Sequence, residues 1–402
     1  MVFPPVLIGL GAANAIYSLL NFQLIRGLGR LGKTNGKPLA EKPTVSVLIA
    51  ARNEEQRIRK CLECLEAQDY PAAKLQIVVV DDRSEDGTAS ILAEYAARMP
   101  GRFRYLSLSE TAPGFSPKKY ALSQGLLIAS GEIIVTTDAD CIMSPAWVSA
   151  LVEEFSSDTG LVSGLTTYYA AGTGTWEGVQ SLEFFSYAVV AAALIGLRFP
   201  VNGNANNLAY RREVYDEVAG FASHGGIVSG DDDFLIQSIH RNGRWGIRYA
   251  IRPESQVQTE PPLSVGQFWE QRKRWASKCS LYQFKQTLFL SVIFSYYAVI
   301  PICIVAGLFQ HRWLVPGIAS WCVKTGTDWL VMRRASGIFD KRELMRWFLP
   351  TSLLHIPLII AAVLAGSFGE FTWKGQKHRR KVKAAPVVDA KIAGRQASGV
   401  GR

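Results

Sequence analysis

Short hydrophobic runs alternate with segments of helical spacing between Pro43 and about Arg252. The runs predict strands, and the segments in which apolar residues recur every three or four positions predict helices. The predicted strands are 45–51, 77–80, 103–108 and 132–137, and the predicted helices are 54–68, 88–98 and 121–129. Strands that alternate with helices form a mostly parallel sheet covered on both faces. Residues 43–252 are therefore predicted to be a soluble α/β domain, with ligands at the carboxyl ends of its strands.

A long apolar segment precedes this domain. Residues 6–25 are almost free of charge and are long enough to cross a hydrocarbon layer of ~30 Å at ~1.5 Å per residue. A cleaved signal peptide carries its positive charge before the apolar run, whereas here the basic residues Arg26, Arg30, Lys33 and Lys37 follow it. The positive-inside rule predicts an uncleaved anchor, residues 1–26, that ends in the cytoplasm. A buried core helix is the alternative that this basic flank disfavours.

Three apolar segments follow in a predicted membrane region, residues 286–370. Leu288–Leu308 is the strongest candidate span and Phe348–Phe368 is another, whereas 313–331 is weaker because it contains two charged residues, Lys324 and Asp328. If all three segments crossed the membrane, the C-terminal tail would end outside, against the positive-inside rule. Either one segment is re-entrant or interfacial, or the tail is an exception to the rule; we expect the former, with 313–331 as the first candidate.

A shorter apolar segment and the charge distribution complete this picture. Phe184–Leu197 has 14 residues, which suits a buried or interfacial helix better than a span. The chain is 48% hydrophobic and 19% charged, which excludes a disordered protein. Its net charge is +10, but residues 374–402 carry nine Lys or Arg and one Asp, so the other residues contribute only +2. The excess of basic residues thus lies in a predicted disordered tail, which either contacts anionic lipid or is solvated. Because the rest of the chain is nearly neutral, no nucleic-acid partner is expected.

Two acidic pairs end predicted strands. Asp81 and Asp82 follow the strand 77–80, and Asp138 and Asp140 follow the strand 132–137. A hard divalent cation prefers oxygen ligands and keeps waters or substrate phosphates, so one aspartate of the second pair can bind metal while the other accepts hydrogen bonds from a sugar. A solvated acidic turn is the alternative for the second pair. Helix capping explains the polar residues 84–88 but not Asp81.

A third acidic cluster lies further along the chain. Repulsion within Asp231-Asp232-Asp233 is expected to raise the pKa of one carboxyl group, which suits a general base. An acidic helix N-terminus is the alternative.

Gln271, Arg274 and Trp275 fall on one helical face within a predicted interfacial segment, residues 253–285. Arginine donates to phosphate oxygens and tryptophan offers a flat wall to a sugar ring. A juxtamembrane basic-aromatic belt is the alternative.

In this order, the four motifs resemble those of the membrane-bound branch of the family 2 inverting glycosyltransferases, which includes cellulose, hyaluronan and ceramide-glucosyl synthases. The likeness runs from Val45 to about Lys278, and the segments 47–55, 118–122 and 202–212 also match the family. The resemblance implies the GT-A fold, a Rossmann-like and mostly parallel sheet in a cytoplasmic domain, joined to transmembrane or interfacial helices. It places the protein in the cell's inner membrane as a multi-pass protein.

The resemblance also implies roles for individual residues. Asp140 would bind Mg²⁺ or Mn²⁺, and Asp232 would be the catalytic base with Asp231 beside it. The residues implied to bind the nucleotide-sugar donor are Glu54, Asp81, Asp82, Lys118 and Asp138. The residues implied to close over diphosphate and acceptor are Gln271, Arg274 and Trp275.

The implied reaction is a single in-line displacement that inverts the anomeric centre without a covalent glycosyl-enzyme. Three or four apolar segments are few for a channel that threads a growing polysaccharide. We therefore expect the transfer of one sugar to a lipid acceptor, and the resemblance implies a UDP-hexose as the donor. A processive polysaccharide synthase is the second interpretation. A membrane scaffold with an inactive transferase fold is the third, although every acidic motif position is filled.

Overall fold

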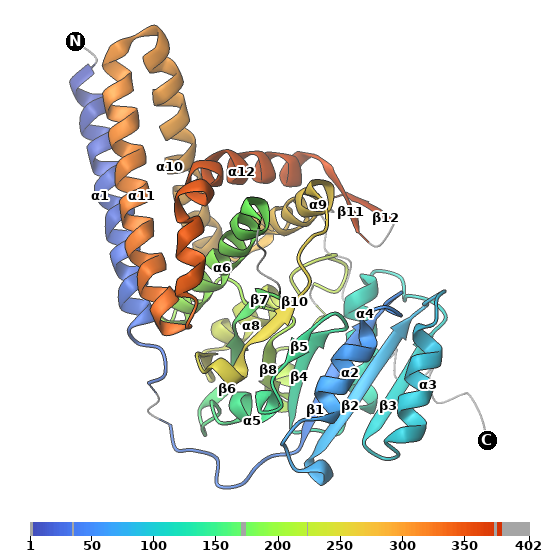
Figure 1. Ribbon diagram of the computed structural model, residues 1–402. Coiled ribbons are helices and arrows are strands. Elements are labelled where there is room, and N and C mark those ends of the chain that lie inside the picture. Colours follow the sequence, from blue (N-terminus) through green and yellow to red (C-terminus); the bar gives the residue numbers. More distant parts are fainter. Residues whose placement is uncertain (1–2, 34–35, 170–173, 223, 374–375, 380–402) are drawn as a thin grey trace. The chain divides into compact units, whose positions relative to one another are not determined.

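The computed structural model describes residues 3–33, 36–169, 174–222, 224–373 and 376–379 (Figure 1). These residues belong to two compact units. The helical unit contains the chain up to residue 35, residues 165–203 and residues 248–380, and the sheet unit contains residues 36–164 and 204–247. The predicted disordered tail, 374–402, lies outside the described residues except for 376–379.

The sheet unit is built on a mostly parallel sheet, as the hydrophobic pattern predicts. Its strand order is β3-β2-β1-β4-β8-β6-β9. The first four strands pair in parallel, whereas β8 runs antiparallel to both β4 and β6. β1 and β2 are almost entirely buried, which is typical of parallel strands covered on both faces. The strands are β1 (Val45–Ala51), β2 (Leu75–Asp82), β3 (Phe103–Leu108), β4 (Ile133–Asp138), β6 (Thr159–Gly164), β8 (Leu208–Arg211) and β9 (Gly246–Ala250).

Six α-helices accompany this sheet among the described residues. α4 begins at Pro117, four residues before the predicted start, because proline is favoured in the first turn, where its missing N–H costs no hydrogen bond. α4 and α8 contribute Leu122 and Leu235 to one buried cluster with Leu48 of β1 and Ile134 of β4. The helices are α2 (Ile58–Glu66), α3 (Thr88–Arg98), α4 (Pro117–Ile128), α5 (Trp147–Val152), α7 (Arg212–Glu217) and α8 (Asp233–Asn242).

The helical unit contains the long apolar helices. Among the described residues, α1, α6, α10 and the segment 342–368, which includes α12, are long and apolar enough to cross a membrane. α6 has 22 residues and is mostly buried, so the prediction of a buried helix around 184–197 is confirmed, although the helix is longer. The helices are α1 (Phe3–Leu28), α6 (Thr175–Gly196), α9 (Val265–Ala276), α10 (Phe284–Phe309), α11 (Leu314–Ile338) and α12 (Phe348–Phe368).

Short strands also belong to the helical unit. β7 (Thr166–Tyr168) and β10 (Val257–Thr259) pair in parallel. β11 (Glu370–Trp373) and β12 (Gln376–Arg379) form an antiparallel hairpin directly after α12.

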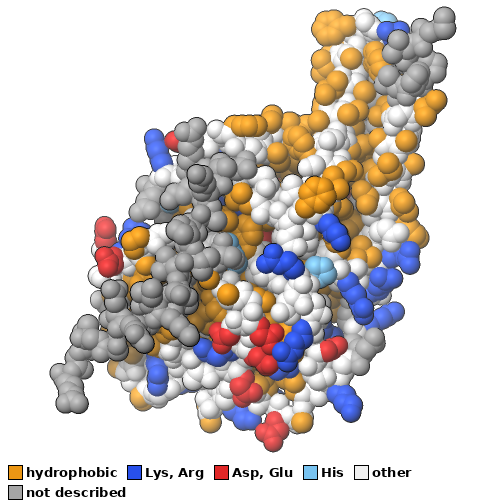
Figure 2. Space-filling model, turned by 180° about the vertical axis from the view of Figure 1, so that it is seen from behind, with side chains coloured by type: hydrophobic (Ala, Val, Ile, Leu, Met, Phe, Trp, Pro, Cys, Tyr) orange, Lys and Arg blue, Asp and Glu red, His pale blue; other side chains and the backbone are white. Residues whose placement is uncertain are grey.

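α1, α10 and α11 stand side by side as a bundle (Figure 1). Their shared core contains aromatic rings, with the ring of Tyr17 stacked on that of Tyr296 at a centroid distance of 4.5 Å. Their outer surface is apolar and includes Ile8, Ile302 and Phe309, and Figure 2 shows hydrophobic side chains gathered over this part of the molecule. Exposed apolar surface of this extent, on helices that satisfy their own backbone hydrogen bonds, suits contact with lipid.

Candidate active site

The two strand-end acidic motifs flank the same strand of the sheet. In the sheet register, Ala51 of β1 pairs with Asp81 of β2, and Ala50 of β1 pairs with Asp138 of β4. Both motifs therefore end at one edge of the sheet, with β1 between them. This is the carboxyl edge of the parallel strands, where ligands bind in open α/β sheets.

Lys118 joins one of these motifs to the third acidic cluster. Its Nζ lies 2.8 Å from Asp138 Oδ1 and 3.1 Å from Asp231 Oδ2. Burial lowers the pKa of the ammonium group, but the two carboxylates outweigh burial and raise its pKa above the ordinary value. Lys118 is therefore a permanent cation at the edge of the sheet, of the kind that binds phosphate oxygens.

The neighbouring lysine has a different position. Lys119 is buried, and its Nζ donates to the backbone oxygens of His224 (2.9 Å) and Ser229 (3.1 Å). It holds the loop that leads to Asp231, while Lys118 faces the carboxylates. The sequence motif contains both lysines and does not distinguish these positions.

Asp232 is buried at the N-terminus of α8. Its Oδ1 accepts from the backbone N–H of Asp233 (2.8 Å), and its Oδ2 accepts from that of Ala205 (3.0 Å). The helix N-terminus interpretation is thus correct for this residue. It does not exclude a second role, because a carboxylate has about four lone-pair positions and can accept from several donors. The contact with Ala205 brings the segment 202–212, which also matches the family, to the acidic cluster.

Asp81 and Asp82 are both buried behind two loops. Asp81 Oδ1 accepts from the backbone N–H of Ser84 (3.1 Å), and Asp82 lies 2.8 Å from Arg83 Nε and 4.0 Å from Arg52 Nη1. Arg52 and Arg83 were not among the predicted site residues. The feature of the sequence that could have indicated them is their position, since each is a basic residue directly after the last residue of a strand.

Glu54 lies in the loop after β1, which contacts the loop after β2. Its backbone N–H donates to Thr88 Oγ1 (2.9 Å), and Asn53 beside it has a left-handed φ of 54°. The Asn53 N–H donates to Ser84 Oγ (2.9 Å), which ties the two loops together. Glu54, in the loop after β1, thus lies in a loop that is tied to the loop following Asp81 and Asp82 at the end of β2.

Asp140 is half-buried in the turn after β4, and Cys141 Sγ lies 3.7 Å from its Oδ1. Burial, and then the negative charges of Asp140 and Asp138, raise the pKa of the Cys141 thiol well above its ordinary value. Among the described residues, no group of three or more His, Cys, Asp and Glu could hold a metal ion. A single carboxylate fits a magnesium-type cation that takes its other ligands from a substrate diphosphate and water.

Gln271, Arg274 and Trp275 lie on α9, in the helical unit. Gln271 Oε1 accepts from the Tyr168 hydroxyl (3.3 Å) and from Arg272. The Trp275 ring stacks on Phe184 with centroids 5.8 Å apart, and the Arg274 guanidinium lies 5.8 Å from the ring centre of Trp373.

A buried ion pair that was not among the predicted site residues holds this motif. Arg272 Nε donates to both carboxylate oxygens of Glu183 on α6, at 2.8 and 3.0 Å, and both side chains are only 1% exposed. The same guanidinium lies 4.4 Å from the ring centre of Trp275. A carboxylate immediately before the apolar segment 184–197 is the signal that indicates this pair.

Comparisons with known proteins agree with this geometry. Residues 46–219 match the family described as "Glycosyl transferase family 2", and residues 133–366 match "Glycosyl transferase family group 2". Beta-monoglucosyldiacylglycerol synthase of Trichormus variabilis is 29% identical over 271 residues, which cover 64% of this chain and 55% of that protein. Glycosyltransferase AglE of Haloferax volcanii is 29% identical over 198 residues, which cover 47% of this chain and 59% of that protein.

The chain thus spans about half the length of the curated relatives it matches. Among solved structures, the mannosyltransferase PcManGT from Pyrobaculum calidifontis, in complex with GDP-Man and Mn²⁺, has a similar fold. The TM-score is 0.57 at 21% identity, over 90% of this chain and 98% of that chain.

Proposed function

Because this chain belongs to family 2 of the glycosyltransferases and has their GT-A fold, we propose that it transfers one sugar from a nucleotide sugar to a membrane lipid. The donor is a UDP-hexose, the reaction inverts the anomeric centre, and the product is a glycolipid. One observation carries the proposal: the Lys118 ammonium group bridges Asp138 and Asp231 at the carboxyl edge of the sheet. A lipid acceptor is supported by the apolar bundle and by the relative named as a glucosyldiacylglycerol synthase.

Asp232 is the base in this proposal. The acceptor hydroxyl is a weak nucleophile, so a carboxylate must accept its proton as the new bond forms. Two backbone N–H groups fix the orientation of the Asp232 carboxylate beside the other acidic residues of the cluster. Asp231 keeps Lys118 in place.

The donor lies along the edge of the sheet. Asp81, Asp82 and Glu54 contact the nucleotide base, and Asp138 contacts the ribose or the donor sugar. Lys118 stabilises the negative charge that develops on the leaving diphosphate. Asp140 holds Mg²⁺ or Mn²⁺, and the bound cation adds positive charge at the same diphosphate. That Gln271, Arg274 and Trp275 contact diphosphate and acceptor stays a prediction.

The orientation proposed for this protein is that of an inner-membrane enzyme with a cytoplasmic catalytic domain. The basic residues in the last turn of α1 and after it, at positions 26, 30, 33 and 37, support it through the positive-inside rule. Nucleotide sugars and the acceptor's headgroup then meet at the inner leaflet.

The test is incubation of membranes that contain the protein with a panel of UDP- and GDP-sugars and a native lipid extract, followed by mass analysis. We expect one new glycolipid that carries a single sugar. A ladder of long chains supports the processive synthase instead, and the absence of any transfer or donor hydrolysis supports the inactive scaffold.

A variant pair tests the base. Asp232→Asn keeps the size of the side chain and should lower kcat by roughly 10²–10⁴-fold. Glu94→Gln, which changes a surface carboxylate paired with Arg59, is the control and should transfer sugar normally. Near-normal transfer by Asp232→Asn removes Asp232 as the base and leaves the family assignment untouched.

A further inference from the structure

α11 contains two charged residues, and by composition alone such residues argue against a helix that crosses a membrane. Lys324 and Asp328 lie one turn apart, and Lys324 Nζ is 3.0 Å from Asp328 Oδ2. The Lys324 side chain is only 1% exposed. Because of these residues α11 is not among the helices that hydropathy selects as spans. The pair lies near the middle of the helix, about four turns from the last residue, Ile338.

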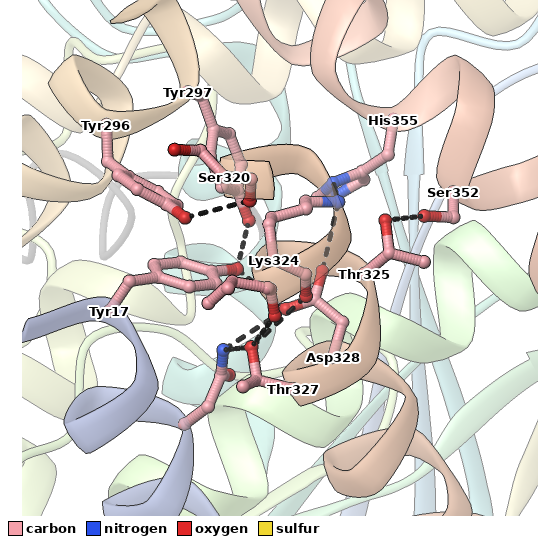
Figure 3. Close-up of polar contacts among 12 residues, drawn as sticks. Tyr17, Tyr296, Tyr297, Ser320, Lys324, Thr325, Thr327, Asp328, Ser352 and His355 are labelled. Carbon is pink, nitrogen blue, oxygen red and sulfur yellow. Dashed lines mark hydrogen bonds and ion pairs between the residues drawn. The ribbon is translucent and has the colours of Figure 1, made fainter. Parts of the chain in front are cut away.

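Three other helices supply partners to this pair (Figure 3). From α1, the Tyr17 hydroxyl donates to Asp328 Oδ1 at 2.7 Å and Asn21 Nδ2 donates to the same oxygen at 3.2 Å. From α12, His355 Nδ1 lies 3.1 Å from Lys324 Nζ, and from α10 the ring centre of Tyr297 lies 5.3 Å from it. Charged residues are tolerated inside a membrane when they face the bundle interior and pair with one another, so this pair does not exclude a crossing.

The directions of the bundle helices follow from their contacts. Only residues 310–313 join α10 to α11, and a Cβ at Gly317 would lie 3.0 Å from the backbone nitrogen of Ile304, so these helices form an antiparallel hairpin. α1 runs parallel to α11, because Asn14 bonds to Ser320 and Asn21 bonds to Thr327. α11 therefore returns to the side of the bundle on which α10 begins.

The start of α12 lies on that side too. Phe339, just after α11, accepts a hydrogen bond at its backbone oxygen from Gln256 Nε2 (3.0 Å), and its ring meets the edge of Tyr249 with centroids 5.8 Å apart. β10 and residues 260–264 connect the segment 249–256 to α9. Residues 277–283 then join α9 to α10.

The end of α12 also lies beside α9. A Cβ at Gly366 would be 2.5 Å from the backbone oxygen of Lys273, so the two helices approach closely. The hairpin after α12 bonds to the same helix, since the Thr372 N–H donates to Glu270 Oε2 (2.6 Å) and Lys273 Nζ donates to the Glu370 oxygen (3.0 Å). In Figure 1, the first part of α12 runs alongside the bundle helices, and its later part bends away and runs across their direction. Both of its ends are thus on one side.

We propose that α1, α10 and α11 cross the bilayer, and that α12 enters it from the cytoplasmic side and returns to that side. Exposed apolar residues of α12, among them Leu349, Leu353 and Phe368, then contact acyl chains of the inner leaflet. The proposal reverses the expectation that 313–331 is the segment that does not cross. It places the basic tail in the cytoplasm, where the positive-inside rule requires it, and it does not depend on the proposed reaction.

The test uses the full chain with a reporter after Arg402, either alkaline phosphatase, which is active only outside the inner membrane, or green fluorescent protein, which is fluorescent only inside. An epitope inserted between Gln310 and His311 reports the other end of α11. We expect a fluorescent and phosphatase-inactive C-terminus, and an epitope that antibody reaches only from outside. An active C-terminal phosphatase, or an epitope reached only from the cytoplasm, overturns the proposal.

A charge-pair series tests how α11 crosses. Asp328→Leu leaves the Lys324 charge without its carboxylate and should lower the amount of full-length protein in the membrane severalfold. The double variant Lys324→Met/Asp328→Leu removes both charges and should restore that amount with the same reporter pattern. Equal amounts for wild type and Asp328→Leu would show that the pair does not lie in the hydrocarbon layer and would contradict the proposal.

Discussion

Lys118 shows how much of the proposed chemistry depends on one side chain. It is held by carboxylates from two separate motifs, Asp138 at the end of β4 and Asp231 before α8. Because these carboxylates raise the pKa of the ammonium group despite burial, the charge persists at every working pH. A cation that is already oriented before the leaving group forms is the arrangement that stabilises a developing negative charge.

Replacing this cation should impair the reaction far more than the fold. Lys118→Met is expected to lower kcat/KM by about 10²–10³-fold, as does the removal of one group that stabilises transition-state charge. The matched control is Lys74→Met, which removes a surface lysine paired with Glu41 and should leave the rate unchanged. Initial rates with radiolabelled donor measure both, and an unaffected Lys118→Met contradicts the proposed role.

His224 makes the fold sensitive to acid. The ring is buried against Phe221 and Phe234, and burial, followed by the charge of Lys119, lowers its pKa to about 3 against the opposing effect of Asp231. Above the unfolded pKa of about 6.5 the imidazole is neutral in both states. Between these two pKa values only the unfolded chain binds the proton, so the free energy of unfolding falls by about 1.4 kcal/mol per pH unit as the pH decreases.

Removing this histidine should flatten the pH dependence. The melting temperature of the wild type is expected to fall more steeply between pH 6.5 and 4.5 than that of His224→Phe. His311→Gln, at an exposed position, is the control and should follow the wild type. Parallel curves for wild type and His224→Phe would mean that the unfolded chain gains no proton at this residue relative to the native state.

At the scale of elements, α6 and α9 are joined by a buried ion pair in addition to contacts between their aromatic rings. Arg272 and Glu183 are buried together, and Arg272 also contacts Gln271 and Trp275. Buried pairs of this kind contribute little net stability, but the loss of one partner is costly because the other charge stays buried. The arginine is thus placed to orient two of the motif's three side chains.

A double-mutant series separates stability from positioning. Glu183→Gln is expected to destabilise the protein by about 3–5 kcal/mol, and Glu183→Gln/Arg272→Met should recover much of this loss. The double variant should still have a reduced kcat, because Gln271 and Trp275 lose the contacts that orient them. Melting temperature and transfer rate are measured together. Full recovery of both would assign the pair a purely structural role.

At the scale of the whole molecule, metal dependence should concern the reaction and not folding. Among the described residues no group of three or more metal-type ligands exists, so we expect the cation to bind together with the nucleotide. Treatment with EDTA should abolish transfer while the melting temperature measured without nucleotide changes little, and Mn²⁺ or Mg²⁺ should restore activity. Asp140→Asn should raise the cation concentration needed for half-maximal activity roughly ten-fold or more. A large loss of thermal stability on treatment with EDTA would contradict the prediction that the cation is not needed for folding.

Several elements were predictable because their signals are local. The predicted strands 45–51 and 103–108 and the predicted helix 88–98 coincide with β1, β3 and α3, since a short hydrophobic run and helical periodicity need only neighbouring residues. The antiparallel strands β6 and β8 were not predicted. Their short, mostly buried runs have no distinctive period, and their pairing depends on segments far along the chain.

The sequence by itself determined the α/β class, the acidic strand ends, the long apolar helices and the family, because periodicity, turn chemistry and ordered motifs are properties of short segments. Only the tertiary structure decided which carboxylates hold Lys118, which carboxylate balances Arg272, and which partners surround Lys324 and Asp328 in α11. The physical reason is the same in each case. A buried charge is stabilised by whatever group the fold brings within a few ångströms, and residues in that position are separated by tens or hundreds of positions in the sequence.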